Sequence, residues 1–290
     1  MAWSRRKVRI ITEDEATGEI RDTYADIKQT LGIPHVSLVF KVFASFPEFF
    51  SAFWKCAHPM LQTGELFSAA DQVRDEAHKR IRNAIPVPDF RSKLAEMEFT
   101  AGAQEELNDV VDLYDYINPV LLLLTAALRQ GLEHPEGAPK HGTFPPHHPT
   151  HPERPILVDE RIAPEPTRKL YDDIKNTLGT PFLNTSYITF GRWPDFLREY
   201  WSAVKPLIGS PAYEEQLTAI RQLALDLAND LPESFQLSAA RMEKAGVPKD
   251  EFPAISQTTT FFLDLLSKQV LNMTVAKIGL AGGAQSSAAA

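Results

Sequence analysis

The segment Tyr24-Ala-Asp-Ile-Lys-Gln-Thr-Leu-Gly-Ile-Pro34 occurs twice in this chain, because a close copy, Tyr171-Asp-Asp-Ile-Lys-Asn-Thr-Leu-Gly-Thr-Pro181, follows 147 residues later. The same offset continues without a gap, and 13 of the 36 aligned pairs from Tyr24 to Pro59 are identical. Glycine, proline and tryptophan all repeat in register, which an accidental likeness between two amphipathic helices would not produce. The sequence therefore predicts two copies of one helical module.

The composition is that of a globular protein without a nucleic-acid surface. The chain has 290 residues, of which 43% are hydrophobic, enough for the cores of two halves of about 130 residues each. Lys and Arg together number 30 and Asp and Glu 38, giving a net charge of −8, whereas phosphate binding relies on clustered cations. The single cysteine, Cys56, excludes an internal disulfide.

No stretch of the sequence has the pattern of a leader or a membrane span. The first residues run straight into charged side chains, without a cationic segment followed by an apolar one. The longest apolar run, from Val120 to Leu128, is far shorter than the roughly 20 residues that cross a bilayer. We therefore expect a cytoplasmic protein with no membrane partner.

Apolar periodicity and helix-ending residues predict helices along the whole chain, and only the weak pattern of residues 7–12 alternates like a strand. In the first copy the predicted helices are 14–31, 36–44, 47–60, 71–84, 90–97, 103–113 and 120–128. In the second copy they are 165–178, 183–190, 194–207, 212–231, 232–245 and 252–280. The predicted fold class is all-α, with two tandem repeats packed as a pseudo-two-fold dimer within one chain and a ligand site where they meet.

The predicted domain boundaries follow the repeat. Residues 13–132 form the first repeat, 133–157 a linker rich in proline and histidine, 158–280 the second repeat and 281–290 a disordered tail. The linker histidines, among them His147, His148 and His151, offer a metal site as one interpretation. No cysteine or carboxylate is interleaved with them at ligand spacing, which favours a solvated connector and no bound metal.

The two copies diverge directly after their shared Gly-x-Pro. The first copy continues with His35-Val-Ser-Leu-Val39 and the second with Phe182-Leu-Asn-Thr-Ser186. Both segments begin helices, whose free amide groups together with polar side chains such as Asn184 could hold a small carboxylate. An equally strong alternative is that these side chains only cap their helices. Standard catalytic motifs, such as a phosphate-binding loop or a nucleophile-elbow serine, are absent from the sequence.

Several features in this order resemble the group I 2-haloacid dehalogenases. They are the Tyr-x-Asp-Ile segment, the helix starts at Phe46-Pro47 and Trp193-Pro194, the run Tyr116-Ile-Asn118-Pro119 before a leucine-rich helix, and the proline-rich linker. The resemblance implies an all-helical pseudo-dimer that acts on D- and L-2-haloacids without a cofactor. In such enzymes a carboxylate activates a water molecule that displaces the halide directly, with inversion and without a covalent ester.

Some residues of this chain match the family pattern and others differ from it. It places the base aspartate eight residues before Pro194, where this chain has Ser186, followed by an aromatic residue, Tyr187. Asn118 matches an active-site asparagine and Thr63 a threonine, while Phe67 stands where the pattern has a glutamate. His35 and Leu38 occupy the positions of a pocket tryptophan and a pocket phenylalanine.

Both carboxylates of the family pattern are thus missing. A serine hydroxyl cannot act as a base at neutral pH without a partner, whereas an imidazole titrates near neutrality. We therefore predict Ser186, Asn118 and His35 as catalytic residues and Thr63, Leu38, Tyr187 and Asn184 as substrate-binding residues. One alternative is that His35 is structural, and another is that the chain is catalytically silent and only binds a small carboxylic acid. A homodimer is an assembly compatible with the sequence.

Overall fold

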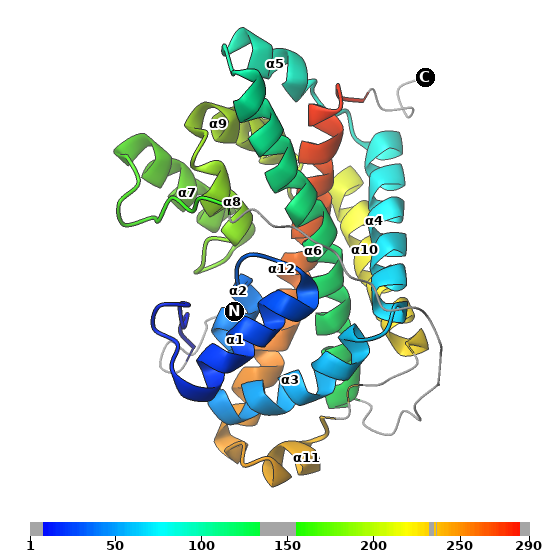
Figure 1. Cartoon of the computed structure of the whole chain (residues 1–290). Coiled ribbons are helices and arrows are strands. Elements are labelled where there is room, and N and C mark those ends of the chain that lie inside the picture. The colour runs from blue at the N-terminus through cyan, green and yellow to red at the C-terminus, as the bar shows by residue number, and fades with distance from the viewer. Residues whose placement is uncertain (1–7, 134–154, 232–234, 236, 285–290) are drawn as a thin grey trace. The chain divides into compact units, whose positions relative to one another are not determined.

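The computed structural model describes residues 8–133, 155–231, 235 and 237–284, and in these ranges it is built from helices (Figure 1). The predicted all-α fold class is confirmed, since the described residues form no strand, only an isolated bridge between Val87 and Ala284. Most of the predicted linker and the end of the predicted tail lie outside the described residues, and so do His147, His148 and His151. The pseudo-two-fold packing of the repeats stays a prediction.

The helices of the first half of the chain are α1 (Gly18–Leu31), α2 (Leu38–Phe43), α3 (Pro47–Leu61), α4 (Glu65–Ala84), α5 (Phe90–Glu96) and α6 (Ala101–Glu133). Those of the second half are α7 (Glu165–Leu178), α8 (Thr185–Phe190), α9 (Pro194–Val204), α10 (Pro211–Asp230), α11 (Ala239–Lys244), the short 3-10 helix η1 (Lys249–Glu251) and α12 (Phe252–Leu280).

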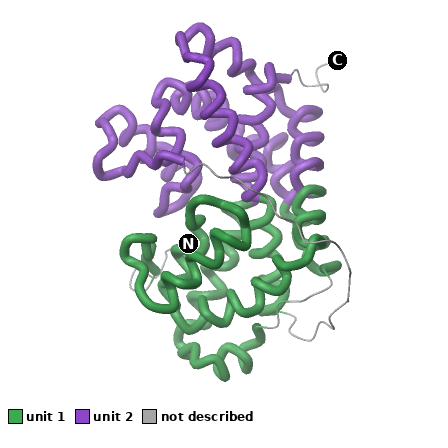
Figure 2. Tube along the Cα trace, viewed as in Figure 1, with its two compact units in different colours: residues 1–72, 119–154, 221–266 green, residues 73–118, 155–220, 267–290 purple. Residues whose placement is uncertain are grey.

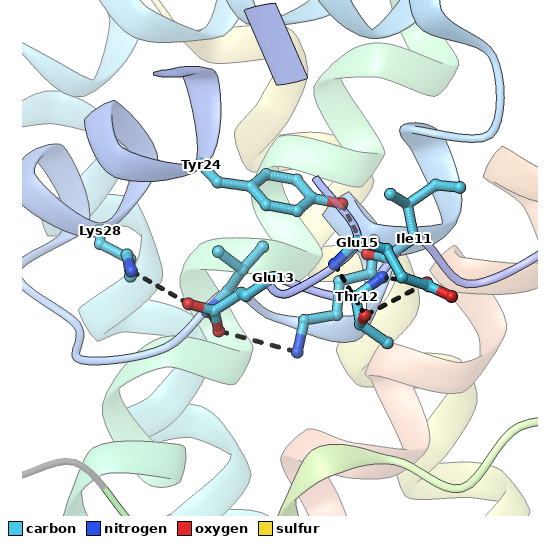
Figure 3. A network of polar contacts seen from close by, with 8 residues as sticks. Ile11, Thr12, Glu13, Glu15, Tyr24 and Lys28 are labelled. Carbon is cyan, nitrogen blue, oxygen red and sulfur yellow. Dashed lines mark hydrogen bonds and ion pairs between the residues drawn. The ribbon is translucent and has the colours of Figure 1, made fainter. Parts of the chain in front are cut away.

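The first helix of each half is held by the same contacts at the offset of 147. The Tyr24 hydroxyl donates to the Ile11 carbonyl over 2.9 Å, and Lys28 bonds Glu13 over 2.9 Å (Figure 3). In the second half the Tyr171 hydroxyl donates to the Val158 carbonyl over 3.2 Å. The remaining equivalents are Lys175 with Glu160, Trp54 with Asp26 and Trp201 with Asp173.

Glycine ends both of these helices. Gly32 and Gly179 adopt the left-handed conformation, with φ of 62° and 67°, and their N–H groups bond back to carbonyls of the last turn. A residue with a Cβ is strained in this conformation, so glycine is the favoured C-cap. The repeated Gly-x-Pro therefore stops α1 and α7 at equivalent points and sets the starts of α2 and α8.

Two predicted helix boundaries were wrong at their N-termini. Helix α1 begins at Gly18 rather than near residue 14, because Thr12 and Glu15 bond each other in a separate turn and Gly18 has φ of 53° (Figure 3). Helix α4 begins at Glu65 rather than at residue 71. In the second half, α11 covers Ala239–Lys244 of the predicted 232–245, and residues 232–234 and 236 lie outside the described residues.

The predicted break at Pro119 was also wrong, because α6 runs through it as one helix of 33 residues. Proline inside a helix removes one main-chain hydrogen bond and crowds the preceding turn. Burial compensates here, since Ile117, Val120 and Leu121 are all 3% exposed or less. This helix is long and apolar enough to cross a membrane, but 89% of its most apolar window is buried inside the protein, as in the core helix of a globular fold.

The chain divides into two compact units, drawn in green and purple in Figure 2. Unit 1 consists of residues 1–72, 119–154 and 221–266, and unit 2 of residues 73–118, 155–220 and 267–290. The boundary between the units falls inside α4, α6, α10 and α12. Each unit therefore takes segments from both halves of the sequence, and the units do not coincide with the two predicted repeats.

One aromatic residue in each unit comes from the other half of the sequence than the ring it packs against. In unit 2, Phe90 from the first half packs edge-on against Phe196, with ring centroids 5.9 Å apart. In unit 1, Phe235 from the second half stacks on Phe53 at 5.3 Å. Gly279 makes room for Phe90, because a Cβ there would lie 2.2 Å from the ring. Gly131 makes room for the main chain of Phe235, because a Cβ at Gly131 would lie 2.0 Å from the Phe235 carbonyl oxygen.

Candidate functional site

Helix α8 carries Ser186 into the interior of unit 2. Asn184 precedes the helix, and its Oδ1 accepts a hydrogen bond from the Ser186 main-chain N–H over 3.4 Å. The Ser186 side chain is completely buried, and its hydroxyl donates to Oε1 of Gln269 on α12 over 3.2 Å. Helices α8 and α12 are thus joined by two uncharged polar side chains.

Asn272, one turn further along α12, joins three tyrosines. Its Nδ2 donates to the Tyr187 hydroxyl over 3.0 Å, and its Oδ1 accepts from the Tyr213 hydroxyl over 2.7 Å. The Tyr200 hydroxyl donates to the Asn272 main-chain carbonyl over 2.7 Å. We call these residues the polar cluster, which comprises Ser186, Tyr187, Tyr200, Tyr213, Gln269 and Asn272.

Two tyrosines of the polar cluster, Tyr187 and Tyr200, stay protonated at physiological pH. Burial raises the pKa of Tyr187 to about 12, although the hydrogen bond with Asn272 opposes the shift. Burial also raises the pKa of Tyr200 well above its ordinary value, and the charge that Tyr187 would carry adds to this effect. Their phenols are therefore neutral hydrogen-bond donors and acceptors, and neither can act as a base near pH 7.

Asn118 lies on α6 in the same unit. One turn earlier on the same face of α6, the Tyr114 hydroxyl lies 2.7 Å from the Thr189 hydroxyl of α8. Asn118 is 3% exposed, and its Nδ2 has no hydrogen-bond partner among the described residues. Nε2 of the fully buried Gln269 also makes no hydrogen bond of full geometry with a described residue, although the Gln269 side chain is close enough to Tyr187 to lower the pKa of its phenol.

Unit 2 therefore contains buried hydrogen-bond donors without formal charge. None of the six residues of the polar cluster is acidic or basic, so an anion bound there would meet no fixed negative charge. Neutral N–H and O–H groups in a buried setting can bind a carboxylate, which accepts several hydrogen bonds. The cluster itself holds no group that could remove a proton from water at neutral pH.

Comparisons with known proteins identify the family of the chain. The family model described as halocarboxylic acid dehydrogenase DehI matches residues 34–187, slightly more than half of the chain. An (R)-2-haloacid dehalogenase of Pseudomonas putida is 30% identical over 275 residues, which are 92% of this chain and 91% of that protein. The chain belongs to the DehI family.

Other relatives support the same assignment. An (R)-2-haloacid dehalogenase of Rhizobium sp. (strain NHG3) is 25% identical over 79% of this chain and 90% of its own. Among solved structures, a D-2-haloacid dehalogenase mutant in complex with D-2-CPA superposes with a TM-score of 0.89 at 29% identity, covering 94% of this chain and 96% of the other. A D-2-haloacid dehalogenase in complex with L-LA reaches 0.87 at 29% identity, covering 93% and 95%.

The seven predicted site residues of this DehI family member divide between the units. Asn118, Asn184, Ser186 and Tyr187 belong to unit 2, where Ser186 and Tyr187 are part of the polar cluster and Asn184 caps α8. His35, Leu38 and Thr63 belong to unit 1. His35 and Leu38 are buried, and the Thr63 hydroxyl donates to the Met60 carbonyl over 2.9 Å at the end of α3. The functional roles of all seven stay predictions.

Sequence reasoning missed Gln269, Asn272, Tyr200 and Tyr213. The family resemblance gave no expectation for these positions, and the predicted helix over 252–280 was interpreted only as a buried core element. A signal was present, because Gln269 and Asn272 stand three residues apart in a helix whose neighbouring residues, such as Val270 and Leu271, are apolar. A buried polar pair of this kind needs hydrogen-bond partners and so points to a polar site.

Proposed function

We propose that this protein hydrolyses small 2-halocarboxylic acids. A water molecule would attack the α-carbon from the side opposite the halogen, so that a carbon–oxygen bond forms while the carbon–halogen bond breaks. The products are the 2-hydroxy acid of inverted configuration, a halide ion and a proton. The observation that carries the proposal is the 30% identity with an (R)-2-haloacid dehalogenase over nearly the whole chain.

The D (R) enantiomer is the proposed substrate. The two relatives described as (R)-2-haloacid dehalogenases and the solved D-2-haloacid dehalogenases all carry that configuration in their names. The polar cluster would contribute neutral donors that hold the acid in place. Ser186 would help to orient the water, since its proton is directed to Gln269 and its lone pairs remain available as acceptors.

The proton released from water needs a base with a suitable pKa, and Ser186 cannot provide it. His35 is the proposed base, because it is the imidazole at the position where the chain departs from the family pattern. The test is His35→Ala, with chloride release as the measurement. Unchanged turnover in this variant would remove His35 from the reaction. A cytoplasmic location stays a prediction.

A second candidate function is supported by the missing carboxylate at position 186. A family member that keeps the polar cluster without a base would bind a small carboxylic acid and release no halide. The two candidates separate in one assay, chloride release from D- and L-2-chloropropionate by the unmodified protein and by Ser186→Asp. Release by the unmodified protein supports the hydrolase. Chloride release only by Ser186→Asp supports the binding protein. Release by neither protein contradicts the proposed dehalogenase function.

A further inference from the structure

Gln269 stands out among the buried polar side chains of unit 2. It is fully buried on α12, and its Oε1 accepts the Ser186 hydroxyl proton over 3.2 Å. Its Nε2 carries two N–H groups, and the Gln269 side chain is close enough to the Tyr187 hydroxyl to lower the pKa of that phenol. Nε2 nevertheless makes no hydrogen bond of full geometry with a described residue, so at least one of its N–H groups lacks an acceptor there. Leaving a buried donor without a partner costs free energy, so a residue of this kind is more easily understood as part of a binding site.

The neighbouring polar side chains do not share this property. Asn272 uses both ends of its amide, toward Tyr187 and Tyr213. Gln216, a second buried glutamine of the same unit, accepts from Arg80 over 3.1 Å and donates to the Ala212 carbonyl over 3.1 Å. The unit therefore satisfies its structural amides, and Gln269 differs from them.

We propose that the Nε2 group of Gln269 binds the carboxylate of the acid substrate, with Ser186 holding the amide in the required orientation. Asn118, whose Nδ2 is also buried and donates to no described residue, is the second donor. The proposal rests on the proposed function only for the choice of an acid as the ligand. An anionic acceptor forms stronger hydrogen bonds than a neutral one, and the uncharged polar cluster does not repel it.

Position 186 then determines what Gln269 can do. An aspartate there would carry no proton to donate, so the amide would have to turn and direct Nε2 toward the aspartate carboxylate. That bond would compete with the substrate, and the new negative charge would repel it. The replacement of a base by Ser186 is thus linked to a stronger binding site for an acid.

The test is calorimetric titration of the full chain with propionate, an acid that has no halogen to lose. We expect Gln269→Leu to weaken propionate binding about tenfold to hundredfold, as for the loss of hydrogen bonds to a charged group. Gln216→Leu is the matched control, a buried glutamine replaced in the same unit, and should leave the affinity unchanged. Thermal unfolding of both variants separates a loss of binding from a loss of folding.

Two further measurements identify the chemical class of the ligand. Titration with sodium chloride distinguishes a carboxylate site from a halide site, because a halide site would bind chloride and show no preference for propionate. Ser186→Asp should weaken propionate binding. If this variant also releases halide faster than the unmodified protein, the kinetics should show a higher KM for the 2-haloacid together with a higher kcat.

Three results would overturn the proposal: no propionate binding by the unmodified protein, equal affinity in a folded Gln269→Leu variant, or chloride binding at the expense of propionate. A protein that binds propionate through Gln269 but releases no halide would contradict the proposed hydrolase activity and leave the assignment of Gln269 standing. The two failures are therefore distinguishable.

Discussion

The aromatic core around α2 and α3 and the one around α8 and α9 have nearly the same geometry and different chemistry. The rings of Phe40 and Phe53 are 6.2 Å apart in unit 1, and those of Tyr187 and Tyr200, their equivalents at the offset of 147, are 6.3 Å apart in unit 2. Both pairs are tilted, at 48° and 35°. Each phenylalanine is thus replaced by a tyrosine whose ring keeps its place.

Other pairs extend this comparison. Phe43 and Phe49 meet at 5.3 Å and 85°, and their equivalents Phe190 and Phe196 at 5.2 Å and 86°. Beside these rings, Val39 of unit 1 corresponds to Ser186 of unit 2. The ring packing is the same around the two helix pairs, while two of the rings in unit 2 carry hydroxyl groups. Equivalent helix pairs can therefore hold an apolar core in one unit and a polar cluster in the other.

Replacing Asn272 with leucine should have the largest effect, because it removes the side chain that joins two buried tyrosines of unit 2. The hydroxyls of Tyr187 and Tyr213 would lose their shared partner while buried, at about 1–3 kcal/mol each. We expect the free energy of unfolding in urea to fall by about 4 kcal/mol. Thr274→Val, which removes only a bond to Val270 within the same helix, is the control. A loss no greater than that of the control would show that the tyrosines find other partners.

Adding a hydroxyl group to the aromatic core of unit 1, by Phe53→Tyr, should also destabilise the protein. Phe53 is 1% exposed and stacks on Phe235, so the added hydroxyl would be buried among aromatic rings. A buried hydroxyl without a partner costs about 2 kcal/mol, which urea unfolding measures. An unchanged or raised stability would mean that unit 1 already offers a hydrogen-bond acceptor for the added hydroxyl. The two cores would then be more alike in polarity than their sequences indicate.

Tyr200→Phe should have a smaller effect of about 1 kcal/mol, because it removes one hydrogen bond and keeps the ring. The variant removes the donor, and the group that loses a bond is the main-chain carbonyl of Asn272, which lies within α12. The measurement is again urea unfolding, together with Phe53→Tyr in the same protein. If the two exchanges act independently, their losses add, and a marked departure from additivity would show coupling between the units.

The smallest effect is expected at the tryptophan–aspartate pairs. Hydrogen bonds from Lys205 and then Trp201 hold the pKa of Asp173 below its ordinary value. This stabilisation is present above the pKa of the unfolded carboxyl and is lost as the pH falls through the folded pKa. Because the side chain of Asp173 is 39% exposed, Asp173→Asn should cost less than about 1 kcal/mol at neutral pH.

The matched variant for this pair is Asp26→Asn, which also loses a bond from a tryptophan, Trp54, but has His58 in place of the lysine. Thermal unfolding across a pH series should show the Asp173→Asn deficit shrinking toward acid. A deficit that stays constant with pH would assign it to packing rather than to charge.

The sequence was most informative where backbone and burial act locally. The periodic stripe and the glycine cap predicted α7 without error, and Pro47 and Pro194 marked helix starts correctly. The helix break predicted at Pro119 was wrong, because tertiary burial outweighs the loss of one main-chain hydrogen bond in α6. Two residues of the polar cluster, Ser186 and Tyr187, were singled out by the family resemblance, and their functional roles stay predictions. Gln269 and Asn272 meet them across 83 and 85 residues of chain, which no local pattern encodes.

The exchange of segments between the two units also constrains how the chain can fold as it leaves the ribosome. Neither unit is complete until α12 has been made, because α12 supplies the last segment of both. The first half emerges with aromatic surfaces that are covered later, by Phe235 in unit 1 for example. Contacts of such long sequence separation slow folding. This protein should therefore fold after synthesis rather than during it, and depend on its final helix for both cores.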